Sequence, residues 1–554
     1  MKKIALILFV SVFIQFVNAQ ETDINKMYQS AVENYEAKNY NKSEDDFSKL
    51  IELAKGIDNL SDPVLFQGSS IFARNNNHEK TFQILNYLAI KRFYSDLDKL
   101  NNEVEFQKWY RTKEWENVIS KIKENKTTEP FRNRQNIKTK LLEAKSVLKK
   151  DNGRLWGYKL WNDNIIVIDY DNTIYSLTKL SNCKTDDDIL YYKIMEPNTL
   201  VFVNTTQQYE GNEYATVLNN YLDDKSSTII HELFHLLQLK TRKFNGDAII
   251  YLDETNARIL LRLEYEALRN ALKSIHENKE TGEVRTYLKD AVTFRKERQK
   301  QYSKYLNAEL ELETLEGLAN YTGFVLSTYE NKYDLAISEI NKREEAKTYT
   351  RPFPYATGPA YGLIFDYLNI NWKNGLDKIY NFAEIYEITV NKSKLKISKK
   401  TLEQAKERNN FEEINKQETV REERQNELIA YYTNLLVNQP ILKVAVTDLD
   451  NYGRSFNMNG TLTLKDKGVV YSSIRGRDKS GGKNFGSFST IKGKDELGKS
   501  GILSYEKNGI TYFVFPLPIK ISGTKIIGEF YEIDLNPNWK SINKNDGNME
   551  IVKE

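Results

Sequence analysis

Apolar side chains recur every three or four residues between residues 20 and 126, which is the spacing of helices that bury one face. Asparagine-rich turns interrupt this pattern at 38–41 and at 75–78. We therefore expect two helical hairpins in this region, each with one of these turns between its two helices. The apolar positions are Met27, Ala31, Tyr35, Tyr40, Phe47, Leu50 and Leu53 in the first hairpin and Val64, Phe66, Ile71, Phe72, Ala73, Phe82, Leu85, Leu88 and Ala89 in the second.

The pattern changes at a polar stretch over 125–135, which contains Thr127, Thr128 and Pro130 and predicts a break between domains. A helix is expected after it, over 136–150. Short β-branched or aromatic runs follow, each bounded by Asn, Asp or Pro, and such runs are typical of strands. They cover 165–170, 189–195, 199–204 and 213–218.

Helical periodicity returns in the middle of the chain, and strand patterns with glycine-containing turns dominate its last part. Long helices are expected over 254–276, 286–305 and 399–436, and strands over 442–446, 460–464, 468–474, 511–516 and 525–531. We therefore expect a multi-domain fold with three parts. These are an α-helical repeat domain at 20–126, an α+β domain at 135–435 and a small all-β domain at 440–554.

The first nineteen residues have the layout of a secretory signal. Lys2 and Lys3 precede an apolar run over residues 4–16, and the small residue Ala19 ends the segment. We expect cleavage after Ala19 and export to a bacterial periplasm or exterior; a membrane anchor is the alternative, although the run is short for a bilayer. No later segment has the length that a membrane span requires. The single cysteine, Cys183, permits no internal disulfide.

Composition adds two limits to this picture. A chain of 554 residues with 40% hydrophobic residues is expected to form about three domains rather than one. Its 80 basic and 77 acidic residues nearly cancel and are interspersed along the chain. This balance provides no basic patch of the kind that binds nucleic acid, so we expect no nucleic-acid partner.

Candidate chemistry is concentrated in an apolar helix expected over 226–238. His231 and His235 are four residues apart, so a helix places both imidazoles on one face, where they can bind one Zn²⁺. Glu232 follows the first histidine and is the candidate general base for a zinc-activated water. The alternative is two histidines on an ordinary helix. Buried imidazoles in such apolar surroundings need partners, however, and a metal ion supplies one.

Two imidazoles make an incomplete catalytic zinc site. With no further histidine or cysteine suitably placed, we expect a carboxylate as the third ligand. Glu254 lies 19 residues after His235, and Glu316 lies 81 residues after it. The second spacing requires an inserted helical pair, on which Glu264 and Glu266 are expected to face solvent or to support the ligands. Spacing alone therefore leaves both Glu254 and Glu316 open as the third ligand.

The segment from Leu315 to Tyr321, Leu-Glu-Gly-Leu-Ala-Asn-Tyr, resembles the third-ligand helix of the aminopeptidase N-like zinc peptidases, and this resemblance favours Glu316. A second segment, Tyr-Ala-Thr-Gly followed by a helix, resembles the part of those enzymes that carries the oxyanion-stabilising tyrosine. The resemblance implies that role for Tyr355, with Tyr361 as the alternative. The chain lacks a clear Gly-x-Met-x-Asn segment before the metal helix, so a preference for free N-termini is not implied.

Two further resemblances concern partners. In thermolysin-like zinc peptidases an edge strand before the metal helix pairs with an extended peptide, and the strand expected over 213–218 is the candidate here. The N-terminal hairpins resemble tetratricopeptide repeats, and Phe106, Trp109 and Trp115 resemble the close of such arrays. By analogy, the helical repeats offer a surface for a protein partner.

These features together predict an exported zinc metallopeptidase of the glutamate-ligand class, which acts on a peptide or protein substrate. Its predicted zinc ligands are His231, His235 and Glu316. Glu232 is the predicted general base, and Tyr355 is predicted to stabilise the oxyanion. The alternative is a binding protein on a zincin-like scaffold, which recruits a partner through the helical repeats with little or no turnover. Hydrolysis of another amide or of an epoxide would use the same metal site.

Overall fold

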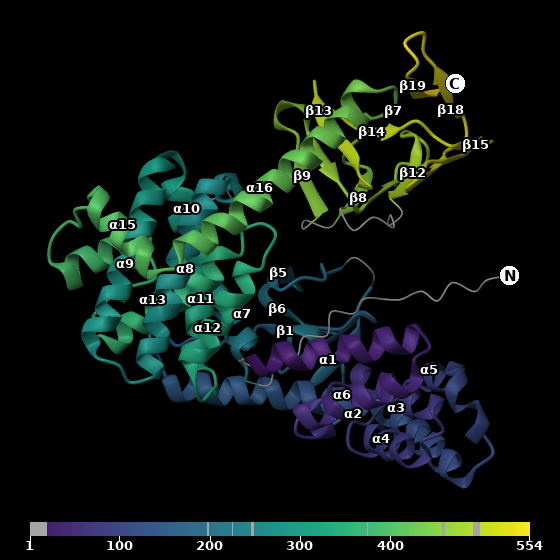
Figure 1. Cartoon of the computed structure of the whole chain (residues 1–554), viewed down its shortest axis with the longest axis horizontal. Coiled ribbons are helices and arrows are strands. Elements are labelled where there is room, and N and C mark those ends of the chain that lie inside the picture. Colours follow the sequence, from purple (N-terminus) through teal and green to yellow (C-terminus); the bar gives the residue numbers. More distant parts are fainter. Residues whose placement is uncertain are drawn as a thin grey trace.

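The computed structural model describes residues 19–196, 199–223, 225–244, 249–373, 375–456, 460–490 and 499–554. It consists of a helical N-terminal region, a central region of helices and one sheet, and a C-terminal region built from sheets (Figure 1). The expected succession of helical, mixed and all-β parts is therefore confirmed. Residues 1–18 of the predicted secretory signal lie outside the described residues. No helix in the described part is both long enough and apolar enough to cross a membrane.

The N-terminal region is built from paired helices joined by short turns. Its helices are α1 (Ala19–Glu36), α2 (Tyr40–Leu53), α3 (Asp62–Arg74), α4 (His78–Ile90) and α5 (Leu97–Asn102). α1 packs on α2 and α3 packs on α4, so both predicted hairpins are confirmed. A side-chain carbon at Gly68 would lie 2.1 Å from the ring of Phe47, so only glycine lets α2 and α3 approach this closely.

One helix, α6 (Lys113–Asp151), runs without interruption through 125–135, so the helix predicted over 136–150 begins earlier than expected and passes through the predicted domain boundary. The two ends of α6 are anchored in different cores, the first in the N-terminal core and the second in the central core. This double anchoring keeps the polar stretch helical, although Pro130 lacks a backbone donor. The buried residues are Trp115, Val118 and Ile122 in the first half and Ile137, Leu141, Ala144 and Leu148 in the second.

The central region contains one six-stranded sheet with the order β3-β4-β2-β1-β6-β5. Its strands are β1 (Ile165–Ile168), β2 (Thr173–Ser176), β3 (Lys184–Thr185), β4 (Tyr191–Ile194), β5 (Thr205–Tyr209) and β6 (Asn212–Leu218). β6 pairs parallel with β1, and the other described pairings are antiparallel. The strand predicted over 213–218 is confirmed as β6, but its predicted place at the sheet edge is wrong.

β5 occupies that edge instead. Glu210 and Gly211 have φ values of 45° and 77°, and this turn folds the chain back so that β5 pairs along β6. The sequence of β5, Thr-Thr-Gln-Gln-Tyr, has no apolar alternation, which explains why the pattern did not predict it. The strand predicted over 199–204 is not formed.

The rest of the central region is helical and shares one large apolar core. Its helices are α7 (Ser227–Thr241), α8 (Thr255–His276), α9 (Thr281–Gln301), α10 (Leu306–Leu312), the π-helix η6 (Glu313–Gly317), α11 (Leu318–Leu326), α12 (Lys332–Glu344), α13 (Phe353–Tyr367), α14 (Phe382–Tyr386), the π-helix η7 (Glu387–Asn391), α15 (Lys399–Arg408) and α16 (Phe411–Thr433). The long helices predicted over 254–276 and 286–305 are confirmed as α8 and α9. They form a packed pair inserted between α7 and α10.

The C-terminal region is all β, as predicted. It has a seven-stranded sheet of order β18-β19-β7-β14-β13-β10-β9 and a six-stranded sheet of order β15-β16-β17-β12-β11-β8. The strands are β7 (Ile441–Val446), β8 (Tyr452–Phe456), β9 (Thr461–Thr463), β10 (Val469–Tyr471), β11 (Ile474–Asp478), β12 (Gly486–Thr490), β13 (Ile502–Lys507), β14 (Ile510–Pro516), β15 (Lys520–Ser522), β16 (Lys525–Ile527), β17 (Tyr531–Leu535), β18 (Trp539–Asn543) and β19 (Met549–Lys553). Side chains from both sheets share one core.

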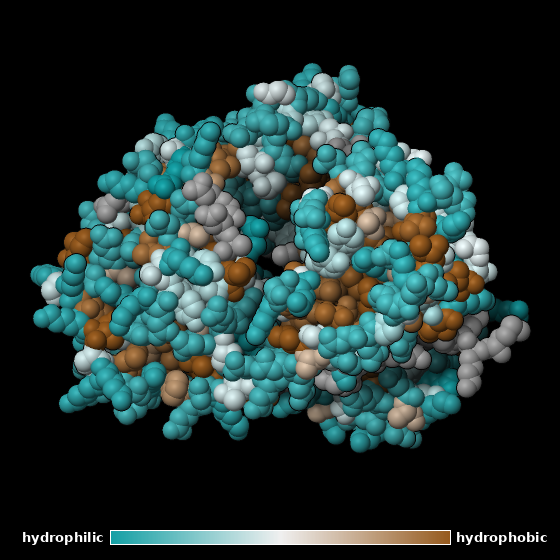
Figure 2. All heavy atoms as spheres, turned by 90° about the horizontal axis from the view of Figure 1, so that it is seen from above, coloured by the Kyte–Doolittle hydropathy of each residue, from teal (hydrophilic) through white to brown (hydrophobic). Residues whose placement is uncertain are grey.

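The N-terminal helices and the C-terminal sheets lie on the same side of the central helices, with β5 and β6 between them (Figure 1). α16 leads from the central helices into the C-terminal sheets. Seen from above, the surface is mostly hydrophilic, with separate hydrophobic patches and a hollow near its centre (Figure 2).

Candidate metal centre

α7 presents the two motif histidines from a helix that is buried nearly all round. Its start is fixed by Asp223, whose carboxylate accepts the backbone N–H groups of Ser227 at 3.0 Å and Thr228 at 2.7 Å. The apolar residues on either side of the motif pack into the central core. His231 and His235 are each 8% exposed. Helix spacing and burial therefore place both imidazoles together, as predicted.

The ligand atoms of His231, His235 and Glu316 form a small triangle. The two Nε2 atoms are 3.0 Å apart, and Glu316 Oε2 lies 3.5 Å from His231 Nε2 and 3.4 Å from His235 Nε2. Tetrahedral zinc, with bonds of about 2.0–2.2 Å, places neighbouring ligand atoms about 3.3–3.6 Å apart. The two distances to Glu316 match this range, and the 3.0 Å between the two histidines is slightly shorter. Two imidazoles and a carboxylate are also a donor set that catalytic zinc uses. The three side chains therefore fit Zn²⁺.

No other group of three His, Cys, Asp or Glu side chains converges in this way among the residues that the structure describes. Glu254, the other candidate for the third ligand, precedes α8 and is not part of the group. Burial raises the pKa of Tyr302, and the nearby charge of Glu254 adds to this rise. Of the two carboxylates that spacing left open, the fold brings Glu316 to the histidines.

Glu316 reaches this position from a π-helical turn. η6 inserts extra backbone between α10 and α11, and π-turns of this kind are frequent at functional sites. The next residue, Gly317, lies against Gly358 of α13. A side-chain carbon at Gly358 would lie 2.4 Å from the Cα atom of Gly317, so the two backbones touch. Glycine at both positions lets the helix that carries Glu316 pack directly on α13.

Tyr355 of α13 lies beside the triangle. Its hydroxyl donates to Glu316 Oε2 at 2.6 Å, and its ring is nearly parallel to that of His231, with 5.8 Å between centroids. Burial, followed by the nearby Glu316 carboxylate, raises the pKa of Tyr355, so the phenol stays protonated and can donate. The alternative tyrosine, Tyr361, is fully buried and donates to Glu264 at 3.0 Å instead.

Glu232 is buried beside the two histidines. Its Oε2 atom has no hydrogen-bond partner among the described residues, and an unpaired buried carboxylate oxygen is costly. Burial raises the pKa of Glu232, and the neighbouring His231 and His235 offset part of this rise. An unsatisfied acceptor next to three converging ligand atoms fits a centre that also contains a water molecule.

His235 and Glu316 shift each other's pKa in opposite directions. Burial lowers the pKa of His235, but hydrogen bonding and the charge of Glu316 outweigh it and raise that pKa to about 9. For Glu316, burial raises the pKa, while His231 and His235 lower it more, so that the value lies well below the usual range. The pair is therefore stabilised as imidazolium and carboxylate when no cation is bound.

Gln238 also contacts the centre, although the sequence pattern did not indicate this residue. Its Oε1 lies 2.9 Å from His235 Nδ1, and its Nε2 donates to the Thr314 carbonyl at 2.8 Å. Since the amide nitrogen is used by Thr314, the amide oxygen faces the imidazole, and Nδ1 must carry the proton. This leaves His235 Nε2 free to bind a metal. The sequence feature that could have indicated this contact is a single glutamine three residues after His235 on an otherwise apolar helix.

Replacing Gln238 with leucine should lower zinc affinity about 10- to 100-fold, because the imidazole loses the partner that fixes its tautomer and orientation. Competition with a chromophoric chelator would measure the change. Gln301→Leu, on the surface of α9, should leave the affinity as it is. An unaltered affinity in folded Gln238→Leu protein would contradict the role of this amide.

No protein family matches the chain, and no curated protein or solved structure shows a significant match to it. The functional assignment therefore depends on the geometry of the site itself.

Proposed function

We propose that this protein is a zinc-dependent metallopeptidase of the glutamate-ligand class, built on a zincin-like central region. The observation that supports it most is the triangle of His231 Nε2, His235 Nε2 and Glu316 Oε2, with sides of 3.0–3.5 Å. Zinc in this place would supply Lewis-acid activation of a water molecule and of a substrate carbonyl. The surrounding side chains provide the proton transfers and the hydrogen bonds that peptide hydrolysis requires.

Glu232 is the general base in this proposal. Its unpartnered Oε2 can accept the proton of a water molecule as that water attacks the peptide carbonyl. The same carboxyl group then delivers the proton to the leaving nitrogen. Burial raises the pKa of Glu232, which makes its carboxylate a stronger base for this proton transfer.

Tyr355 is the proposed oxyanion donor. Its protonated hydroxyl lies at the edge of the triangle, 2.6 Å from Glu316 Oε2, so a small rotation of the side chain can redirect it toward a carbonyl oxygen at the centre. The Arg343 guanidinium lies over the Tyr355 ring, 4.6 Å from its centroid, and supports the ring from α12.

Tyr355→Phe should lower kcat about 100- to 1,000-fold, as expected for loss of one oxyanion donor. The zinc affinity should fall much less than kcat, because the ligand atoms remain. Steady-state kinetics on a cleaved peptide, together with chelator competition, separates the two effects. Tyr367→Phe on the same helix serves as the control, and an equal loss of zinc and of turnover in Tyr355→Phe would assign the hydroxyl to ligand support instead.

The edge strand for substrate pairing is β5 rather than the strand predicted over 213–218. β5 ends the sheet, and its far side has no strand partner among the described residues. β5 also packs against α7, which carries the histidines. A peptide that adds to this edge by main-chain hydrogen bonds would therefore run alongside the metal helix.

Digestion of a peptide library with and without a chelator tests the proposal. Chelator-sensitive cleavage that returns on addition of zinc would support it. Absence of cleavage of any peptide by zinc-loaded protein would favour the alternative, a binding protein that uses its helical repeats for a protein partner. The cleavage profile would also define the substrate class and whether bonds are cut internally or at an end.

A further inference from the structure

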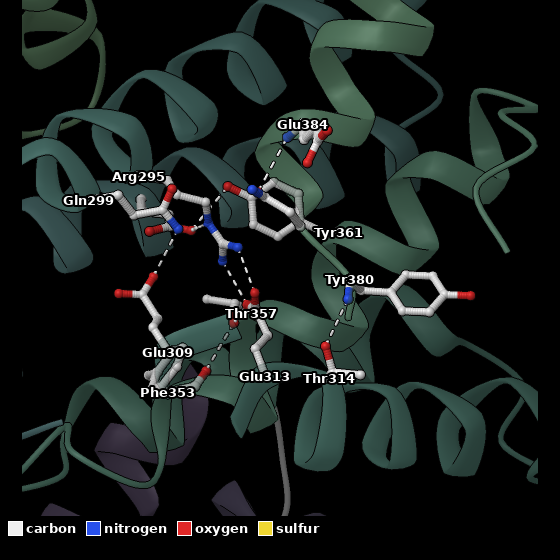
Figure 3. A network of polar contacts seen from close by, with 12 residues as sticks. Arg295, Gln299, Glu309, Glu313, Thr314, Phe353, Thr357, Tyr361, Tyr380 and Glu384 are labelled. Carbon is white, nitrogen blue, oxygen red and sulfur yellow. Dashed lines mark hydrogen bonds and ion pairs between the residues drawn. The ribbon is translucent and has the colours of Figure 1, made fainter. Parts of the chain in front are cut away.

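Five charged side chains form a buried network of ion pairs that includes a residue of η6, the π-helix that carries Glu316. They come from α8, α9, α10 and η6, and each side chain is at most 1% exposed. We name this group the Arg295 cluster, and Figure 3 shows three of its members, Arg295, Glu309 and Glu313. Its members are Glu264, Arg295, Arg298, Glu309 and Glu313.

Arg295 is the centre of the cluster. Its two terminal nitrogens donate to the two oxygens of Glu313, both at 2.6 Å, and its Nε donates to Glu264 Oε1 at 2.6 Å. Arg298 connects Glu264 at 2.7 Å with Glu309 at 2.6 Å. Paired bonds of this kind fix both distance and orientation, because the guanidinium fork is rigid.

The cluster is joined directly to the candidate metal centre. Glu313 precedes Glu316 by three residues on the same π-helix. The Thr357 hydroxyl donates to Glu313 Oε1, and Thr357 follows Tyr355 by two residues on α13. Two hydrogen bonds thus connect η6 with α13, one between Thr357 and Glu313 and one between Tyr355 and Glu316. The two helices also touch at Gly317 of η6 and Gly358 of α13.

A buried group of three carboxylates and two guanidinium ions is an expensive way to stabilise a fold. Desolvation of the charges offsets much of their attraction, and apolar residues of similar size would stabilise the core as well or better. A network of buried charges is better explained by a need to hold one defined geometry. Here that geometry is the position of η6, the π-helix that carries Glu316.

We propose that Arg295, Glu313 and Thr357 are positioning residues that fix Glu316 against the two histidines. The inserted pair α8 and α9 is then part of the metal centre, since α9 supplies Arg295. This inference rests on the proposed metal centre, but not on peptide hydrolysis.

The test compares Thr357→Val, Thr357→Ser and wild type by zinc affinity, measured in chelator competition. Valine keeps the shape and removes the bond to Glu313, so the affinity should fall about 10- to 100-fold, as for other residues that support a zinc ligand. Serine restores the hydroxyl and should restore the affinity. Thr293→Val is the matched control, because Thr293 is also buried and its hydroxyl donates to the Lys289 carbonyl of its own helix.

A second readout separates positioning from general stability. Thermal unfolding of the metal-free proteins should be similar for Thr357→Val and Thr293→Val, whereas the visible spectrum of bound Co²⁺ should change only in Thr357→Val. A change of this kind reports the geometry of the ligands rather than the stability of the fold.

Arg295→Lys is the second variant, because lysine keeps the charge but cannot make the paired bonds to Glu313. It should also weaken zinc binding. Wild-type zinc affinity in either folded variant would overturn the positioning role. If wild-type protein itself bound no zinc, the metal centre would be wrong and the positioning role would fall with it. If zinc binding followed the expected order but no peptide were cleaved, only the peptidase proposal would fail.

Discussion

Replacing Glu232 with glutamine should leave bound zinc in place and lower the rate of peptide hydrolysis about 100- to 10,000-fold. The amide has nearly the size of the carboxylate and does not belong to the ligand triangle of His231, His235 and Glu316. It cannot accept the proton of an attacking water, however, and the proton transfer to the leaving nitrogen is lost with it. Initial rates on a cleaved peptide and metal analysis of the same samples measure both quantities.

The control for this substitution is Glu407→Gln, which makes the same change at an exposed position on α15. It should affect neither zinc content nor rate. Hydrolysis at the wild-type rate by Glu232→Gln protein would remove Glu232 as the base. Loss of zinc from this variant would mean that Glu232 helps to bind the metal. We do not expect this loss, because Glu232 is not part of the triangle.

The local part of the site was predictable because it depends only on helix geometry. His231 and His235 share a face whatever the rest of the chain does, and the apolar residues around them indicate a buried helix. Glu316 was not accessible to this reasoning, because it lies 81 positions after His235 and α8, α9 and α10 come between them in the chain. The resemblance of its surroundings selected it, and the fold brings it to the histidines.

Features that depend on tertiary contacts were missed or placed wrongly. β5 has a polar sequence that becomes a strand only because the turn at Glu210 and Gly211 lays it along β6. α6 stays helical through 125–135 because its two ends are held in separate cores. In each case packing overrides the local pattern, which predicted no strand over 205–209 and a helix that begins only at residue 136.

The sequence gave no signal of the positioning role that we propose for residues of the Arg295 cluster. Arg295 and Arg298 are three residues apart on a helix with many charges, and such a pattern usually marks a solvated face. Glu264 was expected to face solvent or to support the ligands, and it is fully buried between the two arginines. Glu266, by contrast, forms an ion pair with Arg269. Burial separates these two glutamates, and burial is a property of the assembled helices.

Glu316→Ala should abolish zinc binding at concentrations that saturate the wild type. Two imidazoles remain after this change, and they make an incomplete catalytic zinc site. The loss of affinity should exceed the roughly 10- to 100-fold expected for a residue that only supports a ligand. Peptide hydrolysis should disappear together with the zinc. Titration with zinc, followed by calorimetry or by chelator competition, measures the affinity.

Glu254→Ala is the decisive comparison, because spacing alone left Glu254 and Glu316 open as the third ligand. Glu254 lies at the start of α8, outside the triangle, so its removal should leave zinc affinity and turnover at wild-type levels. Glu316→Gln adds a variant that keeps the side-chain volume and removes the charge, and it should also lose zinc because a neutral amide is a weak ligand for this ion. Retention of zinc by both Glu316 variants, with loss in Glu254→Ala, would reverse the assignment of the third ligand and with it the reason to assign α8 and α9 to the metal centre.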